Sequence, residues 1–332
     1  MKYYRPIVQT DRCRPKGASV IAGGCSWFTH AECLMRNGDA EVVPVMDIPP
    51  RVLDNITRPR DPVCGLDMTA PQIMGVLNVT PDSFSDGGRH NTFVNAVSRA
   101  NAMIEQGAAL LDIGGESTRP GADFVDSATE ITRTAPVIAA LQAAGITTPM
   151  SIDTRKADVA KAALDTGAVM FNDVTALQYD TASLPLVRDA QPFVCLMHSP
   201  SDPKTMQHDP HYANALLDIY DHLEKRITAC VNVGLPKTRI VVDPGIGFGK
   251  TIDHNLQLIR GLSLFHGLGC PVLLGVSRKR FIGTLGHAQE PADRVAGSIA
   301  IGLEGLRQGV QFLRVHDIWQ TRQAINLWQA TL

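Results

Sequence analysis

Short apolar runs alternate with longer amphipathic stretches from about Gln72 to the end of the chain. Each run is four to seven residues long, the length of a buried strand, whereas the stretches between the runs repeat their apolar positions with a helical period. The runs cover residues 73–79, 110–114, 150–153, 169–172, 193–197, 240–243, 272–276 and 312–315. This alternation is typical of β-α units that build a parallel sheet.

Helical stretches connect these runs. They cover residues 92–106, 127–144, 156–165, 212–233, 255–265 and 292–308, and a closing helix is expected at 318–328. Eight β-α units in roughly 260 residues are the usual content of a TIM barrel. A doubly wound open sheet is the competing α/β architecture, but the sequence lacks the glycine-rich dinucleotide turn that would follow its first strand. We therefore predict a parallel (β/α)8 TIM barrel over residues 72–332, preceded by an N-terminal extension.

Residues 1–71 have a different character, because many glycines and prolines interrupt their apolar segments. Periodicity is weak there, and only segments such as 41–46 resemble short strands. The adjacent Trp27 and Phe28 favour a small packed subdomain over a disordered tail. Since the barrel pattern is complete without these residues, we predict a peripheral extension of unknown role that can be removed near Thr69 without loss of folding or activity.

Composition and charge narrow the classes of function. The 332 residues carry a net charge of −2, which offers no electrostatic basis for binding nucleic acid or an anionic membrane. The seven cysteines are scattered without a CxxC pair, as expected of reduced thiols rather than of a disulfide framework. The N-terminus lacks the apolar core of a secretory signal, and no stretch approaches the ~20 apolar residues of a membrane span. We therefore expect a cytoplasmic protein without nucleic-acid or membrane partners.

A polar residue stands where each predicted strand ends. In strand order these residues are Asn78, Asp112, Asp153, Asn172 with Asp173, His198, Asp243, Ser277 to Lys279, and Arg314 with His316. A single aspartate in such a position would often only cap the following helix. Polar residues at eight consecutive strand ends instead predict an active site, because the carboxyl ends of barrel strands converge on one mouth.

The residue types at this mouth indicate a substrate with two different parts. Asp153, Asp243 and Asn172 suit a flat ring rich in hydrogen-bond donors, because ionised carboxylates only accept hydrogen bonds. Donors and positive charge for an anion come from Lys279, Arg314, His316 and Arg119. Burying carboxylates and cations together costs several kcal/mol per ion unless they are paired, so a functional cluster is favoured over an incidental one.

Two turn-rich loops flank the mouth. Residues 78–88 follow the first strand and residues 114–121 follow the second, and their Gly, Pro, Ser and Asp content permits left-handed turns and movement as lids. Both could be ordinary turns, but Thr118 and Arg119 beside an anion site favour a functional role for the second loop. Residues 243–250 contain a GxGxG sequence that follows the sixth strand and lacks the context of a dinucleotide site.

Eight separated motifs in this part of the chain resemble those of the dihydropteroate synthases, a family of pterin-binding TIM-barrel enzymes. They occur in the family's order at residues 74–88, 114–121, 151–154, 171–174, 196–198, 243–249, 277–279 and 314–317. The resemblance extends from about residue 72 to the C-terminus. Residues 1–71 lie outside the common core of the family.

The resemblance implies a role for each matching residue. Asn78 is similar to the residue that contacts the Mg2+ accompanying the substrate's diphosphate, so Mg2+ is the implied cofactor. Ring contacts are implied for Asp153, Asn172, Asp243 and Lys279, diphosphate contacts for Arg314 and His316, and a place on the mobile substrate loop for Thr118 and Arg119. Ser277 and Lys279 resemble the edge of the p-aminobenzoate pocket. Catalytic roles are implied for Asp153, Lys279 and Arg314, and a homodimer is expected because the family is commonly dimeric.

The implied reaction is an alkyl transfer in folate biosynthesis. The aryl amine of p-aminobenzoate attacks the exocyclic methylene of the dihydropterin diphosphate, and diphosphate leaves. No side-chain nucleophile is needed, which agrees with the absence of a Ser-His-Asp or Cys-His motif.

Two alternatives are a pterin-binding methyltransferase module and a non-catalytic pterin-binding paralogue. The first has no use for a diphosphate site at Arg314 and His316, and the second has no need of the groups for turnover, all of which are present. An assay of diphosphate release with both substrates separates the three.

Overall fold

The computed structural model describes residues 2–79, 89–117, 124–200, 206 and 209–332, and the side chains of all of these except 89–93. Its centre is a parallel sheet of the strands β6 (Gln72–Asn78), β7 (Leu110–Gly114), β8 (Met150–Asp153), β9 (Met170–Asp173), β10 (Phe193–Met197), β11 (Ile240–Asp243), β12 (Leu273–Leu274) and β13 (Phe312–Val315). The strand order is β11-β10-β9-β8-β7-β6-β13-β12, and a bridge between Val242 and Val272 joins the two ends of the sheet. The predicted TIM barrel is confirmed.

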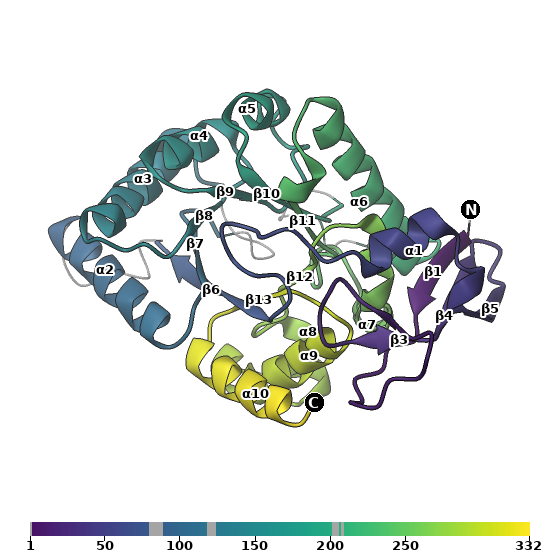
Figure 1. The fold of residues 1–332 in the computed structure, drawn as a ribbon. Helices are drawn as coiled ribbons and strands as arrows, with labels where there is room; N and C mark the ends of the chain where they lie inside the picture. Colours follow the sequence, from purple (N-terminus) through teal and green to yellow (C-terminus); the bar gives the residue numbers. More distant parts are fainter. Residues whose placement is uncertain (1, 80–88, 118–123, 201–205, 207–208) are drawn as a thin grey trace.

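Helices form a ring around this barrel (Figure 1). They are α2 (Arg89–Glu105), α3 (Ser127–Ala143), α4 (Ala157–Thr166), α5 (Ser183–Ala190), α6 (Ala215–Asn232), α7 (Ile252–Arg260), α8 (Arg280–Leu285), α9 (Val295–Arg307) and α10 (Ile318–Ala330), with the 3-10 helices η3 (Lys237–Arg239), η4 (Leu262–Leu268) and η5 (Pro291–Arg294). The sequence pattern missed α5 and α8, which are only 8 and 6 residues long and therefore too short to show a helical period. No helix in the described part of the chain is long and apolar enough to cross a membrane.

Two predicted helices differ from the observed elements for local reasons. The stretch predicted from residue 212 becomes helical only at Ala215, because the Asn214 side chain accepts a hydrogen bond from Leu217 N and caps the first turn. The stretch predicted at 255–265 is two elements, α7 and η4, because Gly261 interrupts it.

The N-terminal residues form a small subdomain with its own core, as the aromatic pair suggested. Its elements are β1 (Lys2–Pro6), β2 (Ser19–Val20), β3 (Trp27–Phe28), β4 (His30–Met35), β5 (Ala40–Pro44), η1 (Val45–Asp47) and α1 (Pro50–Thr57), with an antiparallel sheet in the order β1-β4-β5. Phe28 is fully buried among Tyr4, Ile21 and Ile56 in a cluster separate from the barrel core. The strand suggested at 41–46 is β5, which ends at Pro44.

This extension is less peripheral than its composition suggested. The chain between α1 and β6 crosses the end of the barrel opposite the carboxyl ends of the strands (Figure 1). There, buried Val63 and Met68 pack against inward-facing strand residues such as Met74 and Phe312 and form the floor of the barrel. Arg60 fastens the same segment, since its Nη2 donates to the carbonyl of His266 at 3.1 Å. Residues 60–68 are therefore part of the barrel core.

Candidate active site

Three of the predicted site residues, together with Gly114, lie in one register line across the barrel. Asn78 pairs with Gly114, Gly114 with Asp153, and Asp153 with Asn172, on the adjacent strands β6 to β9. A Cβ atom on Gly114 would lie 3.7 Å from both Asn78 Oδ1 and Asp153 Oδ2. Because glycine has no such atom, a space stays open between this amide and this carboxylate at the ends of their strands.

Arg314 joins this line from the neighbouring strand β13, which pairs with β6. Its Nη2 donates to Asp153 Oδ2 at 2.6 Å and its Nε donates to Asp112 Oδ2 at 2.6 Å. Asn172 Nδ2 donates to the same Asp112 oxygen at 3.1 Å. The guanidinium is thus held between two buried carboxylates, while the Arg314 side chain stays 23% exposed.

The second oxygens of both carboxylates remain available. Among the described residues, Asp112 Oδ1 and Asp153 Oδ1 are buried acceptors without a hydrogen-bond partner. Burial raises the pKa of Asp153 to about 7, with Arg314 opposing the shift and Asp112 adding to it. An unpaired buried acceptor is costly, so this pair of oxygens is suited to receive donors from a bound ligand.

Asp243 and Lys279 form a second part of the mouth, which borders Arg314. Asp243 Oδ1 accepts a hydrogen bond from Gly245 N at 2.7 Å. A Cβ on Gly275 would lie 3.7 Å from Asp243 Oδ2 and 3.9 Å from Lys279 Nζ, so both groups border one small space. Burial lowers the pKa of Lys279 to about 8, with Asp243 opposing the shift, and burial raises the pKa of Asp243, with Lys279 opposing it. Each charge therefore reduces the effect of burial on the pKa of the other group.

Ser277 and His316 meet between β12 and β13. The Ser277 hydroxyl accepts from His316 N at 3.2 Å and lies 3.0 Å from its Nδ1. Between Ser277 and Lys279, Arg278 has a φ of 59°, a left-handed conformation that is unfavourable for a side chain of this size. Its side chain forms an ion pair with Asp317, which ties the turn that carries Ser277 and Lys279 to the end of the strand that carries Arg314 and His316.

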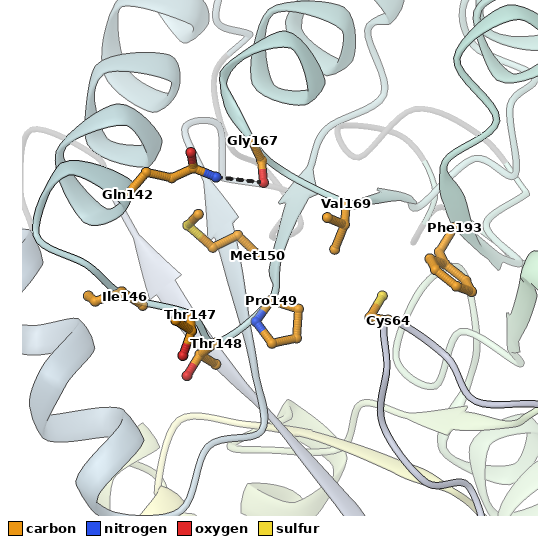
Figure 2. A pocket seen from close by; sticks show the side chains of 10 residues that line it. All are labelled: Cys64, Gln142, Ile146, Thr147, Thr148, Pro149, Met150, Gly167, Val169 and Phe193. Atoms are coloured by element: carbon orange, nitrogen blue, oxygen red, sulfur yellow. Dashed lines mark hydrogen bonds between the residues drawn. The ribbon is translucent and has the colours of Figure 1, made fainter.

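A cavity of about 510 Å3 lies elsewhere (Figure 2). It is bordered by Met150, Val169 and Phe193, which stand at the beginnings of β8, β9 and β10, and by Cys64 of the barrel floor. Its lining contains no charged residue. The cavity is therefore at the opposite end of the barrel from the polar mouth and is unsuited to an anionic substrate.

Comparisons with known proteins agree with this geometry. The pattern of the family described as "Pterin binding enzyme" matches residues 74–316. The dihydropteroate synthase of Escherichia coli K12 is 41% identical over 267 residues, which are 80% of this chain and 94% of that protein.

Two solved structures are also similar. The Xanthomonas albilineans dihydropteroate synthase with 4-aminobenzoic acid has a TM-score of 0.75 at 45% identity, covering 80% of this chain and 94% of that one. The same enzyme in complex with 7,8-dihydropteroate has a TM-score of 0.72 at 43% identity, covering 80% and 95%.

The chain belongs to the dihydropteroate synthase family.

The family match includes every site residue predicted from the sequence. The structure brings Asn78, Asp153, Asn172 and Arg314 together in one part of the mouth and Asp243 with Lys279 in a second part, with Ser277 and His316 beside them. Thr118 and Arg119 lie outside the described residues. The individual roles of these residues in a dihydropteroate synthase stay predictions.

The sequence alone gives no role to Asp112, and the residue lies in the middle of β7 and not at its end as predicted. The structure makes it the residue that holds both Arg314 and Asn172. Conversely, Asp173 at the next strand end is a turn residue, because its carboxylate accepts from Thr175 N and Leu177 N at 2.7 and 2.8 Å. Asp173 therefore stabilises a turn and does not cap the next helix, which begins only at Ser183, whereas Asp112 acts on distant residues; local sequence does not distinguish the two.

A buried ion cluster beside the second loop was also missed. Lys156 Nζ donates to Glu116 Oε2 at 2.8 Å and to Glu130 Oε2 at 2.6 Å. Glu116 Oε1 in turn accepts from Val125 N at 3.0 Å. Glu116 and Val125 stand on either side of the residues that include Thr118 and Arg119, so the cluster fastens the two ends of this loop to the start of α4. No periodicity marks such a contact in the sequence.

The mouth fits a magnesium ion only together with a substrate. Among the described residues, no group of three or more His, Cys, Asp or Glu side chains could hold a metal ion by itself. Mg2+ commonly binds through one or two protein oxygens plus substrate phosphates and water. Asn78 Oδ1, with the open space over Gly114 beside it, offers one such oxygen.

Proposed function

We infer that this protein functions as a dihydropteroate synthase. It condenses (7,8-dihydropterin-6-yl)methyl diphosphate with p-aminobenzoate to give 7,8-dihydropteroate and diphosphate. The observation that carries this function is the convergence at one mouth of two unpaired buried carboxylate oxygens with Arg314 and Lys279. Membership of the family and the 4-aminobenzoic acid and 7,8-dihydropteroate in the structures of relatives support the substrates.

The acceptors of the mouth suit the pterin ring. The amino-pyrimidine edge of a pterin presents several N–H donors, and Asp243, Asp153 and Asn172 present carboxylate and amide oxygens in both parts of the mouth. A donor placed against Asp153 Oδ1 would relieve a buried oxygen that otherwise has no partner in the described structure. Lys279 provides the complementary donor next to Asp243.

The diphosphate is proposed to lie at the ends of β6 and β13. Asn78 is the last residue of β6, His316 directly follows β13, and Arg314 brings positive charge to the same place. Mg2+, held by Asn78 and the diphosphate oxygens, would supply charge neutralisation of the leaving group. Arg314 and His316 would stabilise the same negative charge as it develops, which is the usual source of catalysis when no covalent intermediate is formed.

The reaction forms one bond and breaks one. The amine nitrogen of p-aminobenzoate bonds to the exocyclic methylene carbon, the bond from that carbon to the diphosphate oxygen breaks, and the amine loses a proton. We propose that departure of the diphosphate precedes attack and that the Asp153 carboxylate stabilises the cationic pterin formed. Ser277 and Lys279 would border the p-aminobenzoate, with Thr118 and Arg119 on the loop that closes over it.

A cytoplasmic location and a homodimer complete the proposal. The seven cysteines, all among the described residues, are free thiols, which suits a reducing compartment. The dimer rests on the family resemblance alone.

An assay of diphosphate release tests the function. We expect release in the presence of both substrates to stop when EDTA removes Mg2+, while binding of the bare pterin alcohol, which has no diphosphate, stays nearly intact in EDTA. Absence of release with both substrates present would contradict the proposed reaction. Methyl transfer to a corrinoid or pterin binding without turnover would support the two alternatives.

Asp243→Asn is expected to weaken binding of the pterin diphosphate by roughly 2–4 kcal/mol, because an acceptor becomes a donor that faces the donors of the ring. Isothermal titration calorimetry measures the loss. Asp165→Asn, on the exposed surface of α4, is the matched control and should bind as the parent does. Parental affinity in the Asp243 variant would remove this residue from the ring site.

A further inference from the structure

Lys250 is a buried lysine that the proposed reaction does not use. It follows the GxGxG segment after β11 and is only 4% exposed. Its Nζ donates to the carbonyl of Phe248 at 2.8 Å, to the carbonyl of His198 at 3.3 Å and to His198 Nδ1 at 3.1 Å. These partners are neutral groups, so in the described structure the lysine is buried without a bonded counter-ion, at a cost that needs a compensating role.

His198 is the second member of this contact. It stands directly after β10, where its N–H donates to the carbonyl of Asp243 at 3.1 Å. When Lys250 carries its proton, its ammonium group only donates, so Nδ1 accepts and the ring proton resides on Nε2. Burial and the adjacent Lys250 hold the pKa of His198 well below its usual range, which keeps the imidazole neutral and able to accept.

The Lys250–His198 tie, meaning these three hydrogen bonds, holds a loop whose backbone conformation depends on glycine. Gly245, Gly247 and Gly249 have φ values of +70°, +83° and +57°. A side chain on Gly245 would collide with the carbonyl oxygen of His198. The glycines thus allow the loop to lie directly against the end of β10, where Lys250 fastens it.

This loop touches both charges of the ring site. The carbonyl of Ile246 accepts a hydrogen bond from Lys279 Nζ, and the Phe248 ring centroid lies 4.6 Å from the same atom. Gly245 N donates to Asp243. The position of the loop therefore determines how Lys279 and Asp243 are presented to the mouth.

We propose that Lys250 and His198 are positioning residues for the pterin ring site, which they shape by holding residues 244–248 against Asp243 and Lys279. This role rests on the proposed function of the mouth. Lys250 acts in a second way in its ammonium form, because that charge favours the ionised form of Asp243; Asp243 in turn opposes the burial that lowers the pKa of Lys250 well below its usual range. The groups that lower the pKa of this carboxylate against the effect of burial are Lys279, Gly245 N–H, Lys250 and Arg314.

The test compares Lys250→Met with the parent and with Lys161→Met, a control on the exposed face of α4. Calorimetry with the pterin alcohol and with its diphosphate ester should show that Lys250→Met weakens both by a similar factor, on the order of tenfold. The acid limb of the pH profile of alcohol binding should also move to higher pH, because Asp243 loses a neighbouring positive charge. Affinities within about twofold of the parent, or a loss confined to the ester, would overturn the proposal.

A second pair of variants decides the question if Lys250→Met does not fold. His198→Asn retains an oxygen close to the position of Nδ1, whereas His198→Leu removes the acceptor at similar volume. We expect the Asn variant to bind the pterin alcohol nearly as the parent does and the Leu variant to bind it several-fold more weakly. Equal affinities of the two variants for the pterin alcohol would show that the acceptor at Nδ1 does not position the loop, and would overturn the proposal. Diphosphate release by the parent is measured separately, so a failure of the proposed function is not confused with a failure of this inference.

Discussion

Arg314→Ala is expected to abolish measurable turnover and to lower the free energy of unfolding by about 3–5 kcal/mol. Arg314 is the shared partner of Asp112 and Asp153, at 2.6 Å from each. Removing it leaves two buried carboxylates facing each other without a cation, which is more costly than the loss of the two contacts alone. Urea unfolding followed by circular dichroism measures the stability, and diphosphate release measures the turnover.

Arg314→Lys is the informative companion variant. A lysine keeps the charge but lacks the planar fork that reaches two carboxylates at once, so we expect a smaller loss of stability and still a large loss of activity. Arg188→Ala, which breaks an ion pair on the exposed surface of α5, should change neither. Parental stability in Arg314→Ala would mean that the two carboxylates are protonated or reorganised in solution.

The same variant tests the division of the mouth into two parts. The resemblance assigns Arg314 to the diphosphate, but the structure places its guanidinium against Asp153 in the ring half. We therefore expect Arg314→Ala to weaken the bare pterin alcohol as well as the diphosphate ester, and the ester more strongly. Unchanged binding of the pterin alcohol would instead show that Arg314 supports only the diphosphate half of the mouth.

A chain that begins at Thr69 is expected to be insoluble or inactive, contrary to the expectation from composition. The truncation removes Val63 and Met68 from the barrel floor. It thereby exposes the buried side chains that they cover, such as Met74 of β6 and Phe312 of β13. It also removes Tyr3, whose hydroxyl donates a hydrogen bond to the Asp221 carboxylate on α6 at 3.0 Å. Expression, a thermal melt and diphosphate release of the truncated protein check this. A soluble product with the parental Tm and activity would show that the barrel closes without its floor.

Met68→Ala isolates the floor from the rest of the extension. We expect it to lower the free energy of unfolding by roughly 2–5 kcal/mol, the range for removing a large buried side chain from a core that cannot collapse around the gap. Met46→Ala is the control, because that side chain is 82% exposed.

The sequence by itself was sufficient for the architecture of the barrel. Strands of a parallel barrel are buried on both faces, so they read as continuous apolar runs, and the run at 150–153 coincides with β8. Its limits appear at β12, where a strand of five residues was expected and the strand spans only Leu273–Leu274. The polar residues of the mouth were also visible, because active-site side chains follow directly after strands whose apolar pattern is strong.

Only the tertiary structure decided which of these polar residues act on one another. Arg314 contacts Asp112 and Asp153 across 202 and 161 residues, and Lys250 contacts His198 across 52. The floor is the same kind of contact, since Met68 meets Phe312 only because β13 closes next to β6. Hydrophobic periodicity records which face of an element is buried but not what covers it. The partners of these residues are set by the closure of the barrel, which brings distant strand ends within hydrogen-bond distance and has no local signature in the chain.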